Sequence, residues 1–84
     1  MRTIVRYSVN GELDNRLGNA LRKILEEAGF QRIGTASWEH RNIAIKDFAS
    51  SMNDFWQTAG NPQAAVGAAP AVSVDHVWVY TDAP

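Results

Sequence analysis

The spacing of apolar residues changes repeatedly along this chain, and these changes limit the folds that it can adopt. Residues 2–9 and about 72–81 are rich in β-branched and aromatic side chains, which is typical of strands. Residues 31–39 predict another strand. Between the strands, apolar residues recur every three or four positions, which predicts helices from about Leu13 to Ala28 and from Asn42 or Ile43 to Ala59. The predicted order is β-α-β-α-β.

The two helices have clear apolar stripes and clear ends. Gly29 suits the left-handed position after the first helix, and Phe30 would then pack back on Leu25. Gly60 and Pro62 end the second helix. The predicted stripe of the first helix is Leu13, Leu17, Leu21, Ile24 or Leu25, and Ala28, and that of the second is Ile45, Phe48, Met52, Phe55 and Ala59.

Two helices on one face of a small sheet form a two-layer α/β sandwich, of which the ferredoxin-like fold is a common form. That fold has four strands. The fourth is either a hairpin partner within residues 36–44 or absent, in which case a partner chain could supply the edge. Within residues 31–39, Ile33 and Trp38 do not share a face, and a bulge near Gly34 would reconcile them. Residues 61–71 are small and turn-rich, and predict a flexible loop.

The composition indicates one globular domain, residues 1–84, with 45% hydrophobic and 20% charged residues. A net charge of −1 argues against a generally cationic nucleic-acid binder, although not against a local basic patch. The absence of cysteine excludes disulfides and thiolate metal sites. The first ten residues do not resemble a signal peptide, and no apolar run is long enough to span a membrane. We therefore expect a cytoplasmic protein with no membrane partner, and a homodimer, because a small core gains from association.

The last strand carries large side chains on both faces. With Val77 and Val79 toward the helices, an open sheet face would carry His76, Trp78 and Tyr80. Arg2, Arg6 and Trp38 would join them from neighbouring strands. Aromatic rings interleaved with arginine bind single-stranded RNA on open sheets, but the same residues are enriched in homodimer interfaces, and we favour the interface. In the alternative assignment, Val74, Trp78 and Tyr80 form the core side.

Two polar clusters are candidates for catalytic or metal sites. Glu39, His40 and Arg41 follow Trp38, where a histidine beside a carboxylate suits acid–base chemistry, but neighbours in a strand point to opposite faces and a solvated loop is favoured. The same alternation separates Asp75 from His76. No metal site is expected, and Mg²⁺ would be needed only by a nuclease, with Glu12, Asp14 and Glu39 as candidate carboxylates. Asp14 is most simply a helix cap.

One stretch resembles a known group of proteins. Residues 19–39, NALRKILEEAGFQRIGTASWE, together with Tyr7 and Ser8 at the end of the first strand, resemble the VapD toxins, the small CRISPR-associated endoribonucleases and the GhoS-type antitoxin ribonucleases. The resemblance covers the first half of the chain and implies a ferredoxin-like homodimer acting on RNA. In the first two groups an acidic residue ends the first strand, whereas this chain has Ser8 there. Catalysis would therefore need another set, such as Ser8, Glu39 and His40.

Two functional hypotheses follow. The first is a VapD-like RNA binder or weak endoribonuclease that uses Arg6, Trp38, His40 and His76. The second is a non-catalytic interaction protein, such as a regulator or a phage or toxin–antitoxin accessory factor, whose aromatic sheet face is a protein interface. The affinity of an RNA binder should fall steeply as the salt concentration rises, whereas that of an aromatic protein interface should change little, so the salt dependence of binding distinguishes the two hypotheses.

Overall fold

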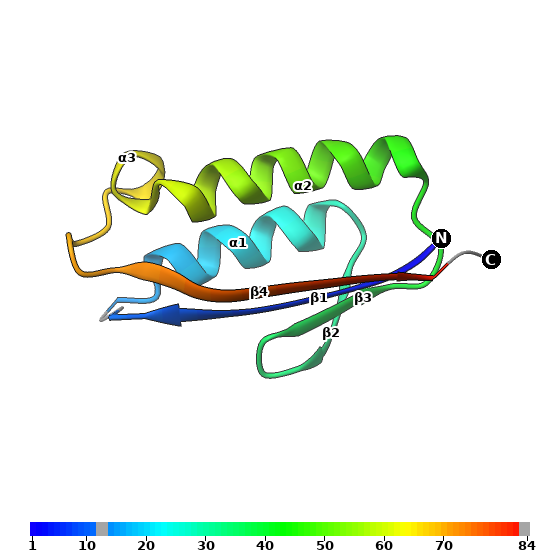
Figure 1. Ribbon diagram of the computed structural model, residues 1–84, viewed down its shortest axis with the longest axis horizontal. Helices are drawn as coiled ribbons and strands as arrows, with labels where there is room; N and C mark the ends of the chain where they lie inside the picture. The colour runs from blue at the N-terminus through cyan, green and yellow to red at the C-terminus, as the bar shows by residue number, and fades with distance from the viewer. Residues whose placement is uncertain (12–13, 83–84) are drawn as a thin grey trace.

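A computed structural model describes residues 1–11 and 14–82 of the chain. The described residues form four strands and three helices. Figure 1 shows the helices on one side of the sheet, so the molecule has two layers and one sheet face without helices. In chain order the elements are β1 (Arg2–Asn10), α1 (Arg16–Glu27), β2 (Gln31–Gly34), β3 (Ser37–His40), α2 (Ile45–Gly60), α3 (Pro62–Val66) and β4 (Ser73–Asp82).

The four strands form one antiparallel sheet in the order β2-β3-β1-β4. β1 is central, with Val5 opposite Trp38 on β3 and opposite Val79 on β4. Residues directly opposite each other share a sheet face, so these three side chains lie on one face. Val5 is fully buried beneath the helices, which makes this the covered face.

The first helix has the predicted end. The backbone N–H of Phe30 donates to the carbonyl of Leu25 at 2.9 Å, and that of Gly29 donates to Glu26 at 3.0 Å. Gly29 has a φ of +93° and Phe30 is buried, which together make a Schellman motif. The helix begins at Arg16, and its cap residue is Asn15 rather than the predicted Asp14, with no capping hydrogen bond from the Asn15 side chain. Asp14 lies one residue before the cap, and its carboxylate accepts a hydrogen bond from the backbone N–H of Arg16. The predicted start at Leu13 lies outside the described residues.

The second helix confirms most of its predicted apolar stripe. Met52 and Phe55 are buried, and Phe48 and Ala59 pack against the core. Ile45 was predicted in the same stripe, but this was wrong, because 74% of its surface is exposed. The chain turns into the helix at Ala44, so Ile43 takes the buried place instead.

Residues 31–40 form a hairpin rather than the single strand predicted for 31–39. β2 and β3 pair antiparallel, with a register irregularity between Arg32 and Gly34. The extra strand expected within residues 36–44 is therefore present as β3. The hairpin explains why Ile33, which is 51% exposed, and Trp38, which is buried, have different surroundings.

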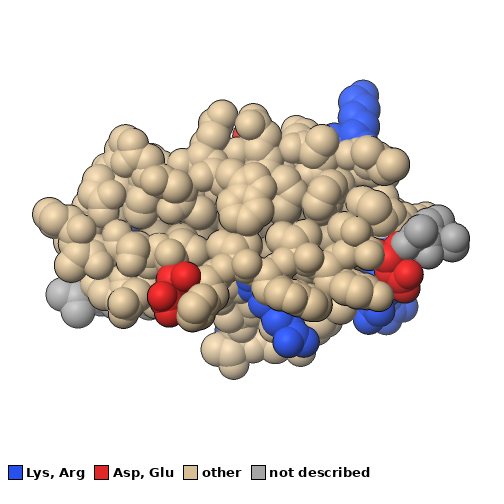
Figure 2. Space-filling view, in the orientation of Figure 1, with Lys and Arg blue, Asp and Glu red and all other residues tan. Residues whose placement is uncertain are grey.

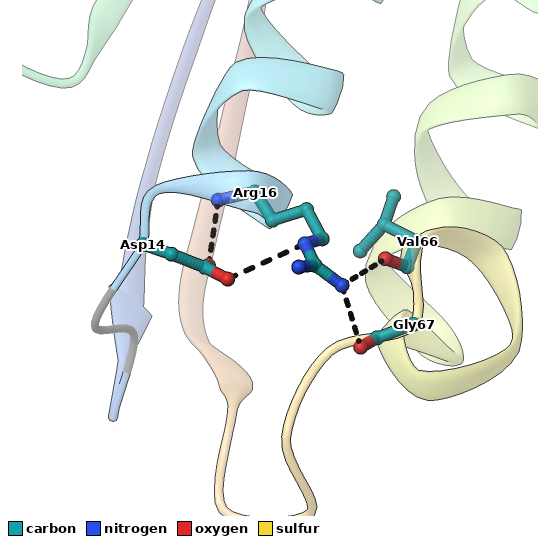
Figure 3. Close-up of polar contacts among 4 residues, drawn as sticks. All are labelled: Asp14, Arg16, Val66 and Gly67. Carbon is teal, nitrogen blue, oxygen red and sulfur yellow. Dashed lines mark hydrogen bonds and ion pairs between the residues drawn. The ribbon is translucent and has the colours of Figure 1, made fainter.

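The segment 61–71 contains a short helix where we predicted only a flexible loop. Pro62 occupies the first turn of α3, and the side chain of Asn61 accepts a hydrogen bond from the backbone of Ala64. Arg16 links this helix to α1: its guanidinium donates to the carbonyls of Val66 at 3.5 Å and Gly67 at 3.2 Å (Figure 3). The mobility of the segment stays a prediction.

The core lies between the sheet and the two long helices. Its fully buried members include Val5, Leu17, Leu21, Leu25 and Phe55. Tyr7 packs edge-on against Phe55, with ring centroids 5.5 Å apart. Within residues 1–11 and 14–82, no helix has both the length and the apolar character that crossing a bilayer requires.

Candidate binding surface on the open sheet face

The sheet face opposite the helices, here called the open face, carries a polar and aromatic surface. The alternation of side chains along each strand, together with the pairing register, assigns its members. They are Arg2, Ile4, Arg6 and Ser8 on β1, Ser37 and Glu39 on β3, and His76, Trp78, Tyr80 and Asp82 on β4.

The preferred assignment of β4 is confirmed from Val77 onward. Val77 and Val79 pack against the core, whereas Trp78 is 49% and Tyr80 is 41% exposed. The alternative assignment, with Trp78 and Tyr80 on the core side, is wrong. The simple alternation also fails for Val74, which packs against the core. The pairing register of β1 and β4 shifts between Ser8 and Val9, so that Asp75 is an extra residue and Val74 returns to the covered face.

The centre of the open face is a stack of two aromatic rings with an arginine beside it. The rings of Trp78 and Tyr80 are nearly parallel, with an angle of 8° and centroids 5.8 Å apart. The guanidinium carbon of Arg6, directly opposite Trp78 in the sheet, lies 5.3 Å from the centroid of the Trp78 ring. This is within the range of a cation–π contact. Three side chains thus form one exposed platform.

Arg2, the second arginine of the open face, is paired with a carboxylate. Both Nε and Nη2 of Arg2 lie 2.8 Å from the same carboxylate oxygen of Glu39. Arg41 approaches the other oxygen of Glu39 at 3.9 Å. The charge of Arg2 is therefore partly neutralised within the face. Among the described residues Arg6 forms no ion pair with a carboxylate, so its charge is the more available to an anionic ligand.

A hollow of about 260 Å³ adjoins the aromatic platform. It lies between the β1–β4 pair and the start of β3, and the surface that lines it is mostly apolar. The residues that line it are Arg6, Tyr7, Ser8, Ala36, Ser37, His76 and Trp78. An apolar hollow beside exposed aromatic rings is suited to stacking.

Trp38 was predicted on the open face, and this was wrong. It pairs with Val5, is only 4% exposed and belongs to the core cluster. The hairpin turn ahead of it sets the register of β3, and this register turns the indole toward the helices. The Nε1 atom of Trp38 is buried and has no hydrogen-bond partner among the described residues.

The three candidate catalytic residues are not brought together. Ser8 and Glu39 share the open face, but Ser8 lies opposite His76 whereas Glu39 lies opposite Ile4, four residues away along β1. His40 points to the covered side, where its ring meets Phe30 edge-on at 5.5 Å and its Nδ1 accepts from the backbone N–H of Asn42. The predicted separation of Glu39 from His40 is confirmed.

Asp75 and His76 lie close together, although we predicted their side chains on opposite faces of the sheet. The bulge at Asp75 brings its Oδ2 atom within 3.3 Å of Nε2 of His76. Within the described residues, no group of three histidine, aspartate or glutamate side chains is arranged to hold a metal ion. Asp14 instead contacts Arg16 at 3.3 Å, and Glu12 lies outside the described residues.

Sequence reasoning missed Ser37 on the open face and one exposed aromatic residue on α2. Ser37 on the open face could have been found only with the β2–β3 turn correctly placed. Trp56, which is 48% exposed on α2, stands off the apolar stripe of that helix, and a helical projection would have identified it as a surface aromatic. Comparison of the chain with protein-family models, with curated proteins and with solved structures gives no match.

Proposed function

We propose that this chain is a single-stranded RNA-binding protein that works as a homodimer and binds RNA on the open face. The observation that carries the proposal is the exposed platform of Trp78, Tyr80 and Arg6. Every base has a face that can stack on an aromatic ring, and an arginine beside the ring can contact the phosphate. The mostly apolar hollow beside the platform would then take the face of a second base.

We also propose that the fold is ferredoxin-like and related to the VapD group. The supporting observation is the way that two β-α-β units interlock. β1 and β2, joined by α1, are separated by β3, and β3 and β4, joined through α2, are separated by β1. This is a split β-α-β arrangement. The resemblance of residues 19–39 to RNA-acting proteins points to the same class of ligand.

The proposal is binding rather than cleavage. A nucleophile, its base and a stabilising group must lie within hydrogen-bond reach of one reacting centre. Ser8, Glu39 and His40 do not share such a centre, because His40 lies on the covered face. Binding on the platform needs none of them to act together.

Fluorescence anisotropy of a labelled single-stranded RNA, titrated with the protein, tests the proposal. Removing a stacking ring costs about 1–3 kcal/mol, so Trp78→Ala should weaken binding by about 5- to 150-fold. Arg6→Ala should also weaken it. Arg22→Ala removes the same charge from the exposed side of α1, where Arg22 pairs with Glu26, and should leave the affinity unchanged.

Salt dependence supplies an independent measurement. If Arg2 and Arg6 each contact one phosphate, the affinity should fall about sevenfold between 50 and 200 mM salt, from a slope of about −0.7 per contact for single strands. No detectable binding at 50 mM salt, or equal effects of Arg6→Ala and Arg22→Ala, would show that the open face is not an RNA surface.

The second candidate is a protein interface on the open face. It is favoured by the balance of charge on this face, where Arg2 and Arg6 are matched by Glu39 and Asp82. Binding to such a partner should vary little with salt, because burial of apolar surface provides most of the free energy. Trp78→Ala would weaken either kind of binding, so the salt series is the measurement that separates the two.

A further inference from the structure

The outer edge of β4 is the longest unprotected edge of the sheet. Among the described residues β4 pairs only with β1, so the backbone groups on its other side have no strand partner. The run Val77–Thr81, VWVYT, contains no charge, glycine or proline. Long, uncharged edges of this kind pair readily with another strand, and proteins usually protect them.

The opposite edge of the same sheet is protected. β2 has only four residues, against ten in β4. The guanidinium of Arg32 donates to the carbonyls of Gly34 at 3.0 Å and Thr35 at 2.8 Å, so the end of this strand is occupied by the chain's own side chain. The β2 edge is thus protected against pairing with another strand, and the β4 edge is not.

The helix above the open edge adds apolar surface beside it. One flank of α2 faces α1 and carries polar residues that include Asp47, Ser50 and Asp54. The other flank, here called the α2 flank, carries Ile45, Ala49 and Trp56, which lie four and seven residues apart on one side of the helix. Ile45 is 74% exposed and Trp56 is 48% exposed.

Charged side chains are sparse on much of this side of the molecule. In Figure 1, β4 lies in front of the other strands with α2 above it. Figure 2, in the same orientation, shows an uncharged surface over the upper and central part of this face, with acidic and basic side chains below it at about the level of β4 and others toward the two ends. Depletion of charge at the centre is typical of a protein–protein interface.

We propose that two copies of this chain associate through the β4 edge and the α2 flank, with their β4 strands paired antiparallel about Val79. The bulge at Asp75 fixes this register. The regular part of β4 runs from His76 to Asp82, and its middle residue is Val79. A two-fold axis at Val79 pairs the whole regular segment with itself and leaves the bulge outside the pairing.

The same register is complementary in chemistry. It places Trp78 opposite the second copy's Tyr80, and His76 opposite the second copy's Asp82, and both pairs occur twice by symmetry. A shift by one residue would place a covered-face side chain opposite an open-face one, which the alternation of the strand forbids. A shift of the axis to Trp78 would draw the bulge into the pairing and set Asp82 opposite Val74.

The size of this face sets an upper limit on the area that a dimer could bury. The long and intermediate dimensions of the molecule, which define the face in Figure 2, are 40 and 23 Å. A rectangle of this size has about 900 Å², which is comparable with the roughly 800 Å² per partner of a typical stable interface.

The consequence for binding is a platform shared by two chains. Antiparallel pairing about an axis normal to the sheet keeps both helix layers on one side and both open faces on the other. Trp78 and Tyr80 of the two copies would adjoin across the axis. This inference rests on the homodimer part of the proposed function and not on RNA binding, which the platform would extend.

Single cysteines test the register, because the chain has no cysteine of its own and any disulfide must join two copies. In Val79→Cys, the two Cα atoms would be about 4.5–5.5 Å apart, which suits a disulfide. In Val77→Cys, they would be about 13 Å apart, four residues along the strand, which is too far. Under mild oxidation, we expect Val79→Cys to give a species of twice the chain mass and Val77→Cys to stay monomeric on a non-reducing gel. Equal cross-linking of both variants would overturn the register.

Charge insertion tests the surface. The double variant Ile45→Lys, Trp56→Lys places four like charges in the dimer interface, and light scattering after size exclusion should show a monomer. Ile33→Lys is the control, because Ile33 is similarly exposed but lies on β2 at the opposite, protected edge. This variant should stay dimeric. Circular dichroism checks that each variant is folded.

The outcomes separate the proposals. A dimer that survives the double variant but dissociates in Trp78→Ala would overturn this inference in favour of association through the open face. A wild-type protein that is monomeric at high concentration would overturn both this inference and the homodimer proposal. RNA binding by such a monomer would leave the RNA proposal standing.

Discussion

Replacing Thr3 by valine should stabilise this protein, although most single substitutions destabilise. Thr3 lies on the covered face of β1, opposite Thr81 of β4, and is fully buried. Its hydroxyl oxygen has no hydrogen-bond partner among the described residues. A buried hydroxyl without a partner costs about 1–3 kcal/mol, whereas valine keeps the branched shape and suits a strand.

We expect the free energy of unfolding to rise by about 1–2 kcal/mol in Thr3→Val. For a domain of this size, each kcal/mol raises Tm by about 4–8 °C. Urea unfolding should show a higher midpoint with an unchanged slope, because the surface exposed on unfolding is nearly the same.

Thr81→Val is the matched control. Thr81 is the cross-strand neighbour of Thr3 but is exposed, so the same change should alter stability by no more than about 0.5 kcal/mol. A loss of 1 kcal/mol or more in Thr3→Val, with Thr81→Val neutral, would refute the reasoning. It would mean that the hydroxyl is hydrogen-bonded in solution, for example by a buried water.

Three further predictions concern the elements that hold the site in place. Gly29→Ala should destabilise by about 1–3 kcal/mol, because the φ of +93° is strained for alanine and the new Cβ would lie 3.0 Å from His40 Nε2. Gly60→Ala, where the added Cβ meets nothing within 4 Å, should instead stabilise by about 0.4–1 kcal/mol, and thermal unfolding of the pair measures the contrast. Phe55→Ala removes a fully buried ring that packs on Tyr7, and it should lower the free energy of unfolding by about 3–5 kcal/mol. Urea unfolding should then show a much lower midpoint, or little folded protein at 25 °C. A free energy of unfolding within about 1 kcal/mol of that of the wild type would show that the ring is not a core member.

The candidate surface could be predicted in part because strand alternation is a local rule. Any register of β4 places Val77 and Val79 on one face of the sheet and Trp78 and Tyr80 on the other. Only the position of the helices decides which of the two faces is covered. The assignment of Trp38 failed because its face depends on where the hairpin turns. A strand of four residues contains too little pattern to fix its own register.

The wrong predictions concern places where the chain departs from the regular spacing of a strand or a helix. The bulge at Asp75 brings Asp75 onto His76 and returns Val74 to the core, although the sequence there reads as continuous alternation. This bulge is set by the pairing of β4 with β1, so the sequence of β4 alone does not reveal it. Ile45 is exposed for a similar reason, since the turn at Ala44 fixes the phase of the helix and gives the buried place to Ile43.

The sequence by itself determined the order of the long elements, most of the apolar stripes of both long helices and the end of the first helix at Gly29 and Phe30. These features depend on residues within a few positions of one another, where spacing and backbone preference act directly. Only the tertiary structure decided that β1 lies between β3 and β4, that Trp38 faces the helices and that Arg6 lies beside Trp78. Those contacts join residues far apart in the chain, and the burial of the whole core selects them.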